Sequence, residues 1–250
     1  MDINKLYRKI ISDLEKEAIS KFKSKDDYLS WNHEVFNKYG YRAYNLSVPE
    51  IDNIVKKYHN QFKMLSFDER LELSSKFYKS GYIGQTSFGL QILKISLPEL
   101  RPKYFDYLDE IVSTFTGWGP TDSFSLYIMQ PLLKRYPNEV KKLLEKWNDS
   151  QHLWKKRASV VVFTRKVGAS GEHLDYLLKL CDNLIWNNED LVRKAVGWAL
   201  KDNMVGKNKE KVLNYIKELR KKGVSSTITL YSIRRLKGKE RKEILRIKPK

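Results

Sequence analysis

The sequence predicts an all-α protein, a superhelix of stacked helix pairs, and three observations support this prediction. Apolar residues recur at spacings of three and four along the chain, which is a helical period. Turn signals interrupt this period at short intervals, while strand-like alternation is rare. Two helical stretches that begin at Leu153 and Leu191, 38 residues apart, share a sequence pattern, which indicates a repeat.

The N-terminal stretch is the first predicted helix. Charged residues alternate with one apolar stripe, which consists of Leu6, Ile10, Ile11, Leu14 and Ala18. Such a stripe predicts an amphipathic helix and not a signal peptide. The same period returns after "SVPE", from Ile51 to Tyr58.

Breaks between helices occur where a Ser, Asp or Asn cap precedes an acid, or where Gly or Pro interrupts the period. They lie at residues 38–50, 63–70, 96–102, 116–122, 135–140, 147–151, 167–172, 186–190, 204–210 and 221–226. Between them we expect roughly a dozen helices of about 10 to 18 residues with short connections. No linker rich in Pro or Ser divides the chain, so residues 1–250 are predicted to form one domain, with a basic C-terminal segment at about 237–250.

The repeat suggests how the helices stack. "LWKKRASV" from Leu153 aligns with "LVRKAVGW" from Leu191, and both follow a turn rich in Asn and Asp. Their offset is close to the period of helix-pair solenoids, roughly 40 residues. Because equivalent helices of successive repeats line one concave face, we predict a HEAT-like solenoid with a concave basic cleft.

The charge points to a polyanionic partner. The chain carries 48 Lys and Arg against 30 Asp and Glu, a formal net charge of +18, with a pI of about 9.7. Nucleic acid is favoured over a membrane, because the charge is spread along the chain and no run approaches the roughly 18 apolar residues of a spanning helix. A generally Lys-rich genome is the alternative explanation. The single cysteine, Cys181, is interpreted as a core thiol in a reducing compartment, so we expect a cytoplasmic protein, nucleoid-associated in a prokaryote.

One arginine falls on an apolar stripe. Arg157 lies three residues after Trp154 and four after Leu153, in the helix that follows "NDSQ". It could extend along the edge of the stripe or pair with an internal acid. It could instead lie at the floor of a groove, where its planar guanidinium would bind a phosphate.

A carboxylate follows the break at "FTGWGPTD". With Gly119 near the cap and Pro120 near the first helical position, Asp122 is predicted in the first turn, where the helix dipole favours an acid. Trp118 in this Gly-flanked turn is a good stacking surface. From Asp122 to Arg157 is 35 residues, and from Arg157 to Trp198 is 41, each about one repeat. The spacing therefore predicts that these side chains face one cleft.

Three motifs contain these residues in one order along the chain. They are "GWGPTD" with Trp118 and Asp122, "LWKKRAS" with Arg157, and "RKAVGWALKD" with Trp198. In order and spacing they resemble the active-site motifs of the AlkD-like family of DNA alkylation repair glycosylases, and the resemblance extends from "SVPE" to the C-terminal basic helices. The first motif departs from the family in having Gly117 and Gly119, where another Trp and Asp are frequent.

The resemblance implies a HEAT-like fold that excises cationic N7- and N3-alkylpurines from duplex DNA, without a metal and without flipping the base. It implies the catalytic residues Asp122, Trp118, Trp198 and Arg157. Asp122 would stabilise the positive charge that develops on the deoxyribose, the two indoles would flank the lesion, and Arg157 would hold the adjacent phosphate. Residues expected to contact DNA are Arg157, Lys156, Lys194, Lys201, Arg234, Arg235 and Lys237. The basic C-terminal block could also be a solvated tail.

Two other readings of the sequence stay open. A noncatalytic helical-repeat protein could bind DNA without excision, as the two glycines of the first motif would allow. A helical-repeat scaffold could bind a protein partner on its concave face. The four histidines are scattered and no metal-ligand spacing or phosphate-binding glycine loop occurs, so we expect neither a metal nor a nucleotide cofactor. We expect a monomer that binds double-stranded DNA containing alkylated bases, with no membrane partner.

Overall fold

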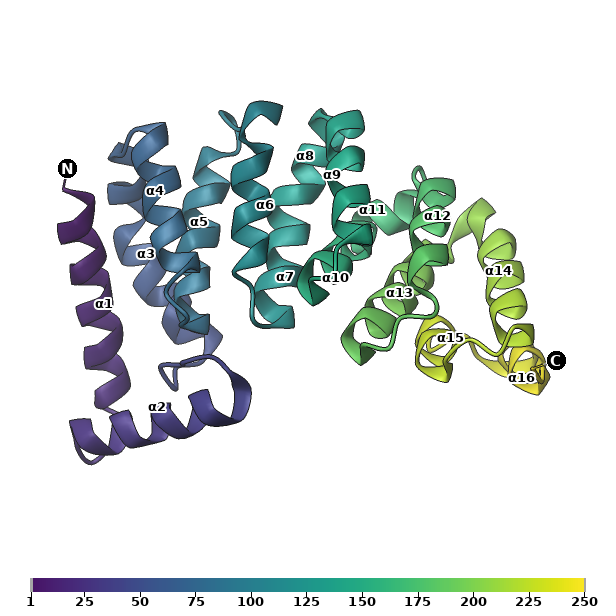
Figure 1. The fold of residues 1–250 in the computed structure, drawn as a ribbon, viewed down its shortest axis with the longest axis horizontal. Coiled ribbons are helices and arrows are strands. Elements are labelled where there is room, and N and C mark those ends of the chain that lie inside the picture. Colours follow the sequence, from purple (N-terminus) through teal and green to yellow (C-terminus); the bar gives the residue numbers. More distant parts are fainter. Residues whose placement is uncertain (1, 250) are drawn as a thin grey trace. The chain divides into compact units, whose positions relative to one another are not determined.

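The computed structural model describes residues 2–249; the last residue of the predicted basic segment 237–250 therefore lies outside the described residues. Across residues 2–249 the chain forms α-helices joined by short turns and by a few 3-10 and π turns (Figure 1). No β-strand occurs in this range, although Arg42 and Tyr82 form one isolated bridge. The all-α prediction is confirmed.

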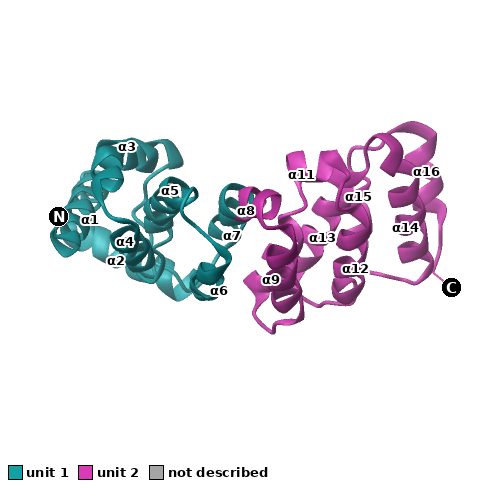
Figure 2. Cartoon of the chain, turned by 90° about the horizontal axis from the view of Figure 1, so that it is seen from above, with its two compact units in different colours: residues 1–128 teal, residues 129–250 magenta. Residues whose placement is uncertain are grey.

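Contacts group the chain into two compact units, residues 1–128 and residues 129–250 (Figure 2). We call them unit 1 and unit 2 and describe each by itself. The prediction that residues 1–250 form one domain stays a prediction.

Unit 1 holds the helices up to the "GWGPTD" motif. Helix α2 runs across the end of α1, while α3, α4 and α5 stack beside one another (Figure 1). The elements are α1 (Ile3–Ile19), α2 (Lys25–Tyr39), α3 (Val48–Met64), α4 (Phe67–Tyr78), η1 (Ile83–Gln85), α5 (Thr86–Ser96), η2 (Pro102–Tyr104), α6 (Phe105–Ser113) and α7 (Trp118–Phe124).

Two capping boxes explain where α3 and α4 begin. The backbone N–H of Ser47 donates to Glu50 Oε2 at 2.7 Å, and that of Ser66 donates to Glu69 Oε2 at 2.8 Å. Each acid thereby satisfies a backbone donor that the helix itself leaves unpaired. The helix starts predicted within residues 38–50 and 63–70 are confirmed.

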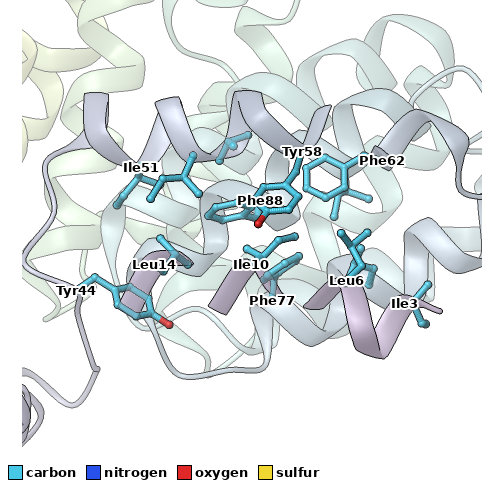
Figure 3. Close-up of a cluster of buried hydrophobic side chains, with 14 of the residues drawn as sticks. Ile3, Leu6, Ile10, Leu14, Tyr44, Ile51, Tyr58, Phe62, Phe77 and Phe88 are labelled. Atoms are coloured by element: carbon cyan, nitrogen blue, oxygen red, sulfur yellow. The ribbon is translucent and has the colours of Figure 1, made fainter. Parts of the chain in front are cut away.

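The core of unit 1 forms around the stripe of α1 (Figure 3). Leu6, Ile10, Leu14 and Ala18 are buried as predicted, whereas Ile11 is only partly buried. The stripe packs against apolar side chains of α3, α4 and α5, including Phe62, Phe77 and Phe88.

Unit 2 holds the other two motifs. A π turn, η3 (Ser125–Met129), spans the boundary, and the elements of unit 2 follow it. They are α8 (Gln130–Arg135), α9 (Pro137–Asp149), α10 (Leu153–Val161), α11 (Arg165–Ser170), α12 (Leu174–Leu184), α13 (Asp190–Asn203), η4 (Gly206–Asn208), α14 (Lys209–Lys221), α15 (Ser226–Ser232) and α16 (Gly238–Arg246).

Helix α13 is central to unit 2, because it packs against α10, α11 and α15. The core includes Trp147 of α9 and Cys181 of α12, both fully buried. The burial of Cys181 confirms the predicted core thiol, and it raises the pKa of that thiol.

One helix break was not predicted. The apolar run after Arg157 suggested a single helix as far as the break at 167–172, but α10 ends at Val161 and α11 begins at Arg165. The Gln130 side chain donates to the carbonyls of Val162 and Thr164 at 2.9 and 3.0 Å. Asn203 donates to the carbonyl of Phe163 at 2.8 Å. Side chains distant in sequence therefore bind carbonyls that a continuous helix would use.

Gly197 lets α13 and α15 approach closely. A Cβ atom at this position would lie 2.7 Å from Tyr231 Cβ and 2.8 Å from the carbonyl oxygen of Ile228. We expect Gly197→Ala to lower the free energy of unfolding by about 1–3 kcal/mol, because the two helices must separate. The midpoint of urea unfolding measures the effect.

A matched control is Gly119→Ala in α7, where an added Cβ meets no atom within 4 Å. There the loss of backbone freedom in the unfolded chain favours alanine by about 0.5–1 kcal/mol. Equal unfolding midpoints for the two variants would contradict the close approach of α13 and α15.

Candidate functional site

Helix α7 presents the first motif. It begins at Trp118, after Gly117 in an extended conformation with φ −158° and ψ 161°. The Trp118 indole is 61% exposed, whereas Asp122 is 9% exposed. Because residues four apart lie on one side of a helix, an exposed indole and a sheltered carboxylate lie next to each other on α7.

Asp122 lies further from the first residue of its helix than predicted. Since α7 begins at Trp118, Pro120 is its third residue, Asp122 is its fifth, and the first turn contains no acid. The carbonyl of Gly117, the residue before the helix, accepts a hydrogen bond from Thr121 Oγ1 at 2.8 Å. Stabilisation by the helix dipole falls off within the first turn, so it gives a weaker reason for an acid here than the sequence suggested.

Arg157 is buried in unit 2, as its place on the apolar stripe of α10 predicted. Its side chain is 6% exposed, and NH1 donates to the carbonyl of Leu191 in α13 at 2.6 Å. This bond ties α10 to α13 and fixes the guanidinium. Arg157 is therefore held by packing and does not extend along an exposed edge of the stripe, while its role as a phosphate ligand stays a prediction.

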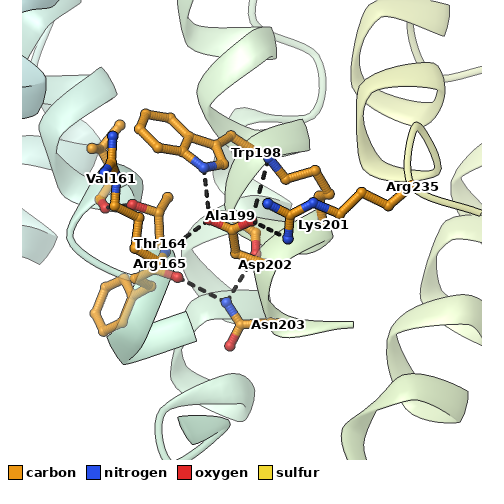
Figure 4. Close-up of polar contacts among 10 residues, drawn as sticks. Val161, Thr164, Arg165, Trp198, Ala199, Lys201, Asp202, Asn203 and Arg235 are labelled. Atoms are coloured by element: carbon orange, nitrogen blue, oxygen red, sulfur yellow. Dashed lines mark hydrogen bonds and ion pairs between the residues drawn. The ribbon is translucent and has the colours of Figure 1, made fainter. Parts of the chain in front are cut away.

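Trp198 lies on α13 and binds an acid that the sequence analysis did not single out. Its Nε1–H donates to Asp202 Oδ2 at 2.6 Å, one turn further along the helix (Figure 4). The same oxygen accepts the backbone N–H of Arg165 at 2.8 Å. Asp202 is 4% exposed, so the carboxylate joins the indole to the start of α11 from a buried position.

Cations surround this carboxylate. Lys201 Nζ and Arg235 NH1 each lie 3.3 Å from Asp202 Oδ1 (Figure 4). Lys201 is 8% exposed and also lies 5.7 Å from the Trp198 ring centroid. Burial lowers the pKa of Lys201, and the neighbouring Asp202 partly offsets that effect. The predicted DNA contact Lys201 is thus a buried, paired ammonium group.

The remaining cations predicted to bind DNA lie nearer the surface. Lys194 is exposed and pairs with Asp190 at 2.7 Å, and Lys156 is half-buried. Arg234 is exposed, and its guanidinium lies 4.8 Å from the Tyr231 ring centroid. Lys237 is exposed just before α16.

The structure places the predicted catalytic residues in two groups. Trp118 and Asp122 lie together on α7 of unit 1, while Arg157 and Trp198 lie on the packed helices α10 and α13 of unit 2. The expectation that all four line one basic concave cleft spans both units and stays a prediction.

Sequence reasoning missed Asp202, Arg165 and Tyr231. Asp202 had a local signal, because it follows Trp198 by four residues in "WALKD" and so shares its side of the helix. Arg165 and Tyr231 reach the same cluster through the packing of α11 and α15 on α13, which no local pattern reveals.

Within residues 2–249, no three His, Cys, Asp or Glu side chains gather closely enough to hold a metal ion. No helix in this range is long and apolar enough to cross a membrane.

The fold and the two groups of residues define an all-α helical-repeat protein. It has an exposed indole beside a sheltered carboxylate in unit 1 and a half-buried indole among basic side chains in unit 2. The chain belongs to the family described as "DNA alkylation repair enzyme", whose sequence profile matches residues 24–236. Its function thus lies in DNA alkylation repair, which makes DNA its partner. No curated relative matches the sequence significantly.

A solved structure shares the fold. It is described as "Predicted DNA alkylation repair enzyme from Enterococcus faecalis" and superposes with a TM-score of 0.68, covering 88% of this chain and 95% of its own. The two sequences are 13% identical, so this similarity supports the helical-repeat fold alone.

Proposed function

We propose that the protein is a DNA glycosylase that hydrolyses the N-glycosidic bond of cationic alkylated purines, N7-alkylguanine and N3-alkyladenine, in duplex DNA without flipping the base. The observation that carries this proposal is the pair on α7, an exposed Trp118 beside a sheltered Asp122. Membership of an alkylation repair family supports it.

The reaction needs little beyond charge stabilisation. The bond between deoxyribose C1′ and purine N9 breaks, and its electron pair stays on the base, which leaves neutral because its ring was cationic. Water adds its oxygen to C1′ and releases a proton. Asp122 stabilises the positive charge on the sugar and orients this water, and no metal takes part.

The other residues would position the lesion. Trp118 and Trp198 would flank the sugar and the cationic base through stacking and cation–π contacts, worth ~0.5–2 kcal/mol each. Arg157, fixed by its bond to Leu191, would hold the phosphate next to the lesion. Indoles on a surface suit a base that stays in the helix, whereas most glycosylases extrude theirs.

Chromatography of the bases released from methylated duplex DNA tests the proposal directly. Release of 7-methylguanine or 3-methyladenine supports it. DNA binding without any release would instead identify a noncatalytic DNA-binding relative, in line with Gly117 and Gly119.

Backbone phosphates should dominate affinity for undamaged DNA. We expect the binding constant to fall about 10³-fold or more between about 50 and 200 mM salt, since six or more neutralised phosphates produce that dependence. Fluorescence anisotropy with duplexes of unrelated sequence measures it. A flat salt dependence would favour the protein-interaction scaffold.

Charge reversal measures how much the cations near the C-terminus contribute to the affinity for duplex DNA. Arg234→Glu combined with Lys237→Glu should weaken binding to all duplexes alike and reduce the salt slope by about two. Arg235 is left unchanged because it pairs with Asp202. Lys134→Glu combined with Lys142→Glu, at exposed lysines of α8 and α9, is the control for the same change in net charge.

A further inference from the structure

The Trp198 indole is held at several points around its edge and face. Its Nε1–H binds Asp202 at 2.6 Å, the Arg165 guanidinium lies 5.8 Å from the ring centroid, and Lys201 Nζ lies 5.7 Å away (Figure 4). Of these contacts only the bond to Asp202 has a fixed direction. The two cation contacts would tolerate rotation of the ring.

Asp202 itself is fixed by its surroundings. Oδ2 accepts both the indole N–H and the backbone N–H of Arg165, and Oδ1 faces the two cations, Lys201 and Arg235. Arg165 has a φ of +51°, a left-handed conformation that side chains rarely adopt, and the bond to Asp202 helps to hold it there. One carboxylate thus couples the orientation of Trp198 to the start of α11.

We propose that Asp202 is a positioning residue for base excision, acting by holding the Trp198 ring in the orientation that stacks on the lesion. This inference rests on the proposed glycosylase function. Asp202 acts through its hydrogen bonds and not by touching the substrate.

The buried charge of the Asp202 carboxylate supports a functional role for this residue over a purely structural one. Asp202 Oδ1 is buried and accepts no hydrogen bond, and its two ion pairs are both 3.3 Å long. Burying such a carboxylate is costly, and apolar side chains of similar volume often stabilise a core equally well or better. A residue that only filled space between α11, α13 and α15 would not need this charge.

Two substitutions separate the hydrogen bonds from the charge. In Asp202→Asn the amide oxygen can still accept from both Trp198 and Arg165, while the negative charge is lost. In Asp202→Ala both are lost. The proposal expects single-turnover release of 7-methylguanine within about threefold of wild type for the Asn variant and about 10²-fold slower for the Ala variant, the cost of a misplaced group.

Binding to undamaged duplex shows whether the fold survives. With one negative charge fewer, the Ala variant should bind as tightly as wild type or more tightly, which a damaged fold would not do. Equal loss of rate in both variants would show that charge and not position matters, and would overturn the proposal. An Ala variant that excises at the wild-type rate would also overturn it.

A spectroscopic measurement does not depend on activity. In ¹⁵N-tryptophan-labelled protein, the Nε1–H signal of Trp198, assigned with Trp198→Phe, should exchange slowly with solvent. The signals of Trp118 and Trp186, both 61% exposed, are internal references for rapid exchange. The Ala variant should lose this protection and the Asn variant should retain it.

The exchange measurement distinguishes failure of the proposed glycosylase function from failure of the positioning role of Asp202. If wild-type protein releases no alkylated base, the proposed function fails. Slow exchange at Trp198 would still support the hydrogen bond by which Asp202 fixes the indole ring. If the Ala variant does not fold, exchange in the wild-type protein decides, because rapid exchange at Trp198 would overturn the proposal.

Discussion

Asp122→Asn is expected to slow release of 7-methylguanine by about 10² or more while leaving duplex affinity nearly unchanged. A neutral amide has almost the same shape as the carboxylate but cannot stabilise the positive charge on the sugar. Single-turnover kinetics on methylated duplex, with enzyme in excess, isolates the chemical step.

A thermal melt on the same preparation excludes unfolding as the cause. Asp122 is the fifth residue of α7 and not part of its first turn, so loss of its charge should change stability little through the helix dipole. If the Asn variant releases the base within about threefold of the wild-type rate, the catalytic role of Asp122 is wrong.

The largest effect on stability is expected at Trp147. Its side chain is fully buried in α9, against which α10 packs, and α10 carries Arg157. We expect Trp147→Ala to lower the free energy of unfolding by about 3–5 kcal/mol, through lost apolar contacts and the cavity left behind. Urea unfolding followed by circular dichroism measures it.

Trp186→Ala is the matched control in the same unit, because that indole is 61% exposed. Its effect should stay within about 0.5 kcal/mol, as for most surface substitutions. Similar losses at the two positions would contradict the core described for unit 2.

Local patterns were sufficient to predict much of the fold. The stripe of α1 and the starts of α3 and α4 follow from helical periodicity and from Ser-Glu capping boxes, which act within a few residues. The break between α10 and α11 could not be predicted in this way. Its apolar run contains no Gly or Pro, and the side chains of Gln130 and Asn203, which lie more than 30 residues away in sequence, bind its carbonyls.

In the candidate site too, features set by local sequence could be predicted, whereas features set by contacts between distant residues could not. The burial of Arg157 follows from its place on an apolar stripe, and Trp198 lies on α13 as its motif indicates. The burial of Lys201 could not be predicted from sequence, because packing of α15 against α13 brings the centroid of the Tyr231 ring to 5.4 Å from its ammonium group. A lysine one turn past an indole is otherwise most simply interpreted as exposed.

The bond between Trp198 and Asp202 joins two residues of one helix, four positions apart. The orientation of the indole is therefore encoded in a five-residue stretch of chain. Helix α11 adds one cation beside the ring, Arg165, while Arg235, which follows α15, pairs with the carboxylate. If Asp202 positions the ring as proposed, a substitution of the Arg165 side chain would change the charge beside the indole and leave its orientation intact, because only the backbone N–H of Arg165 binds the carboxylate.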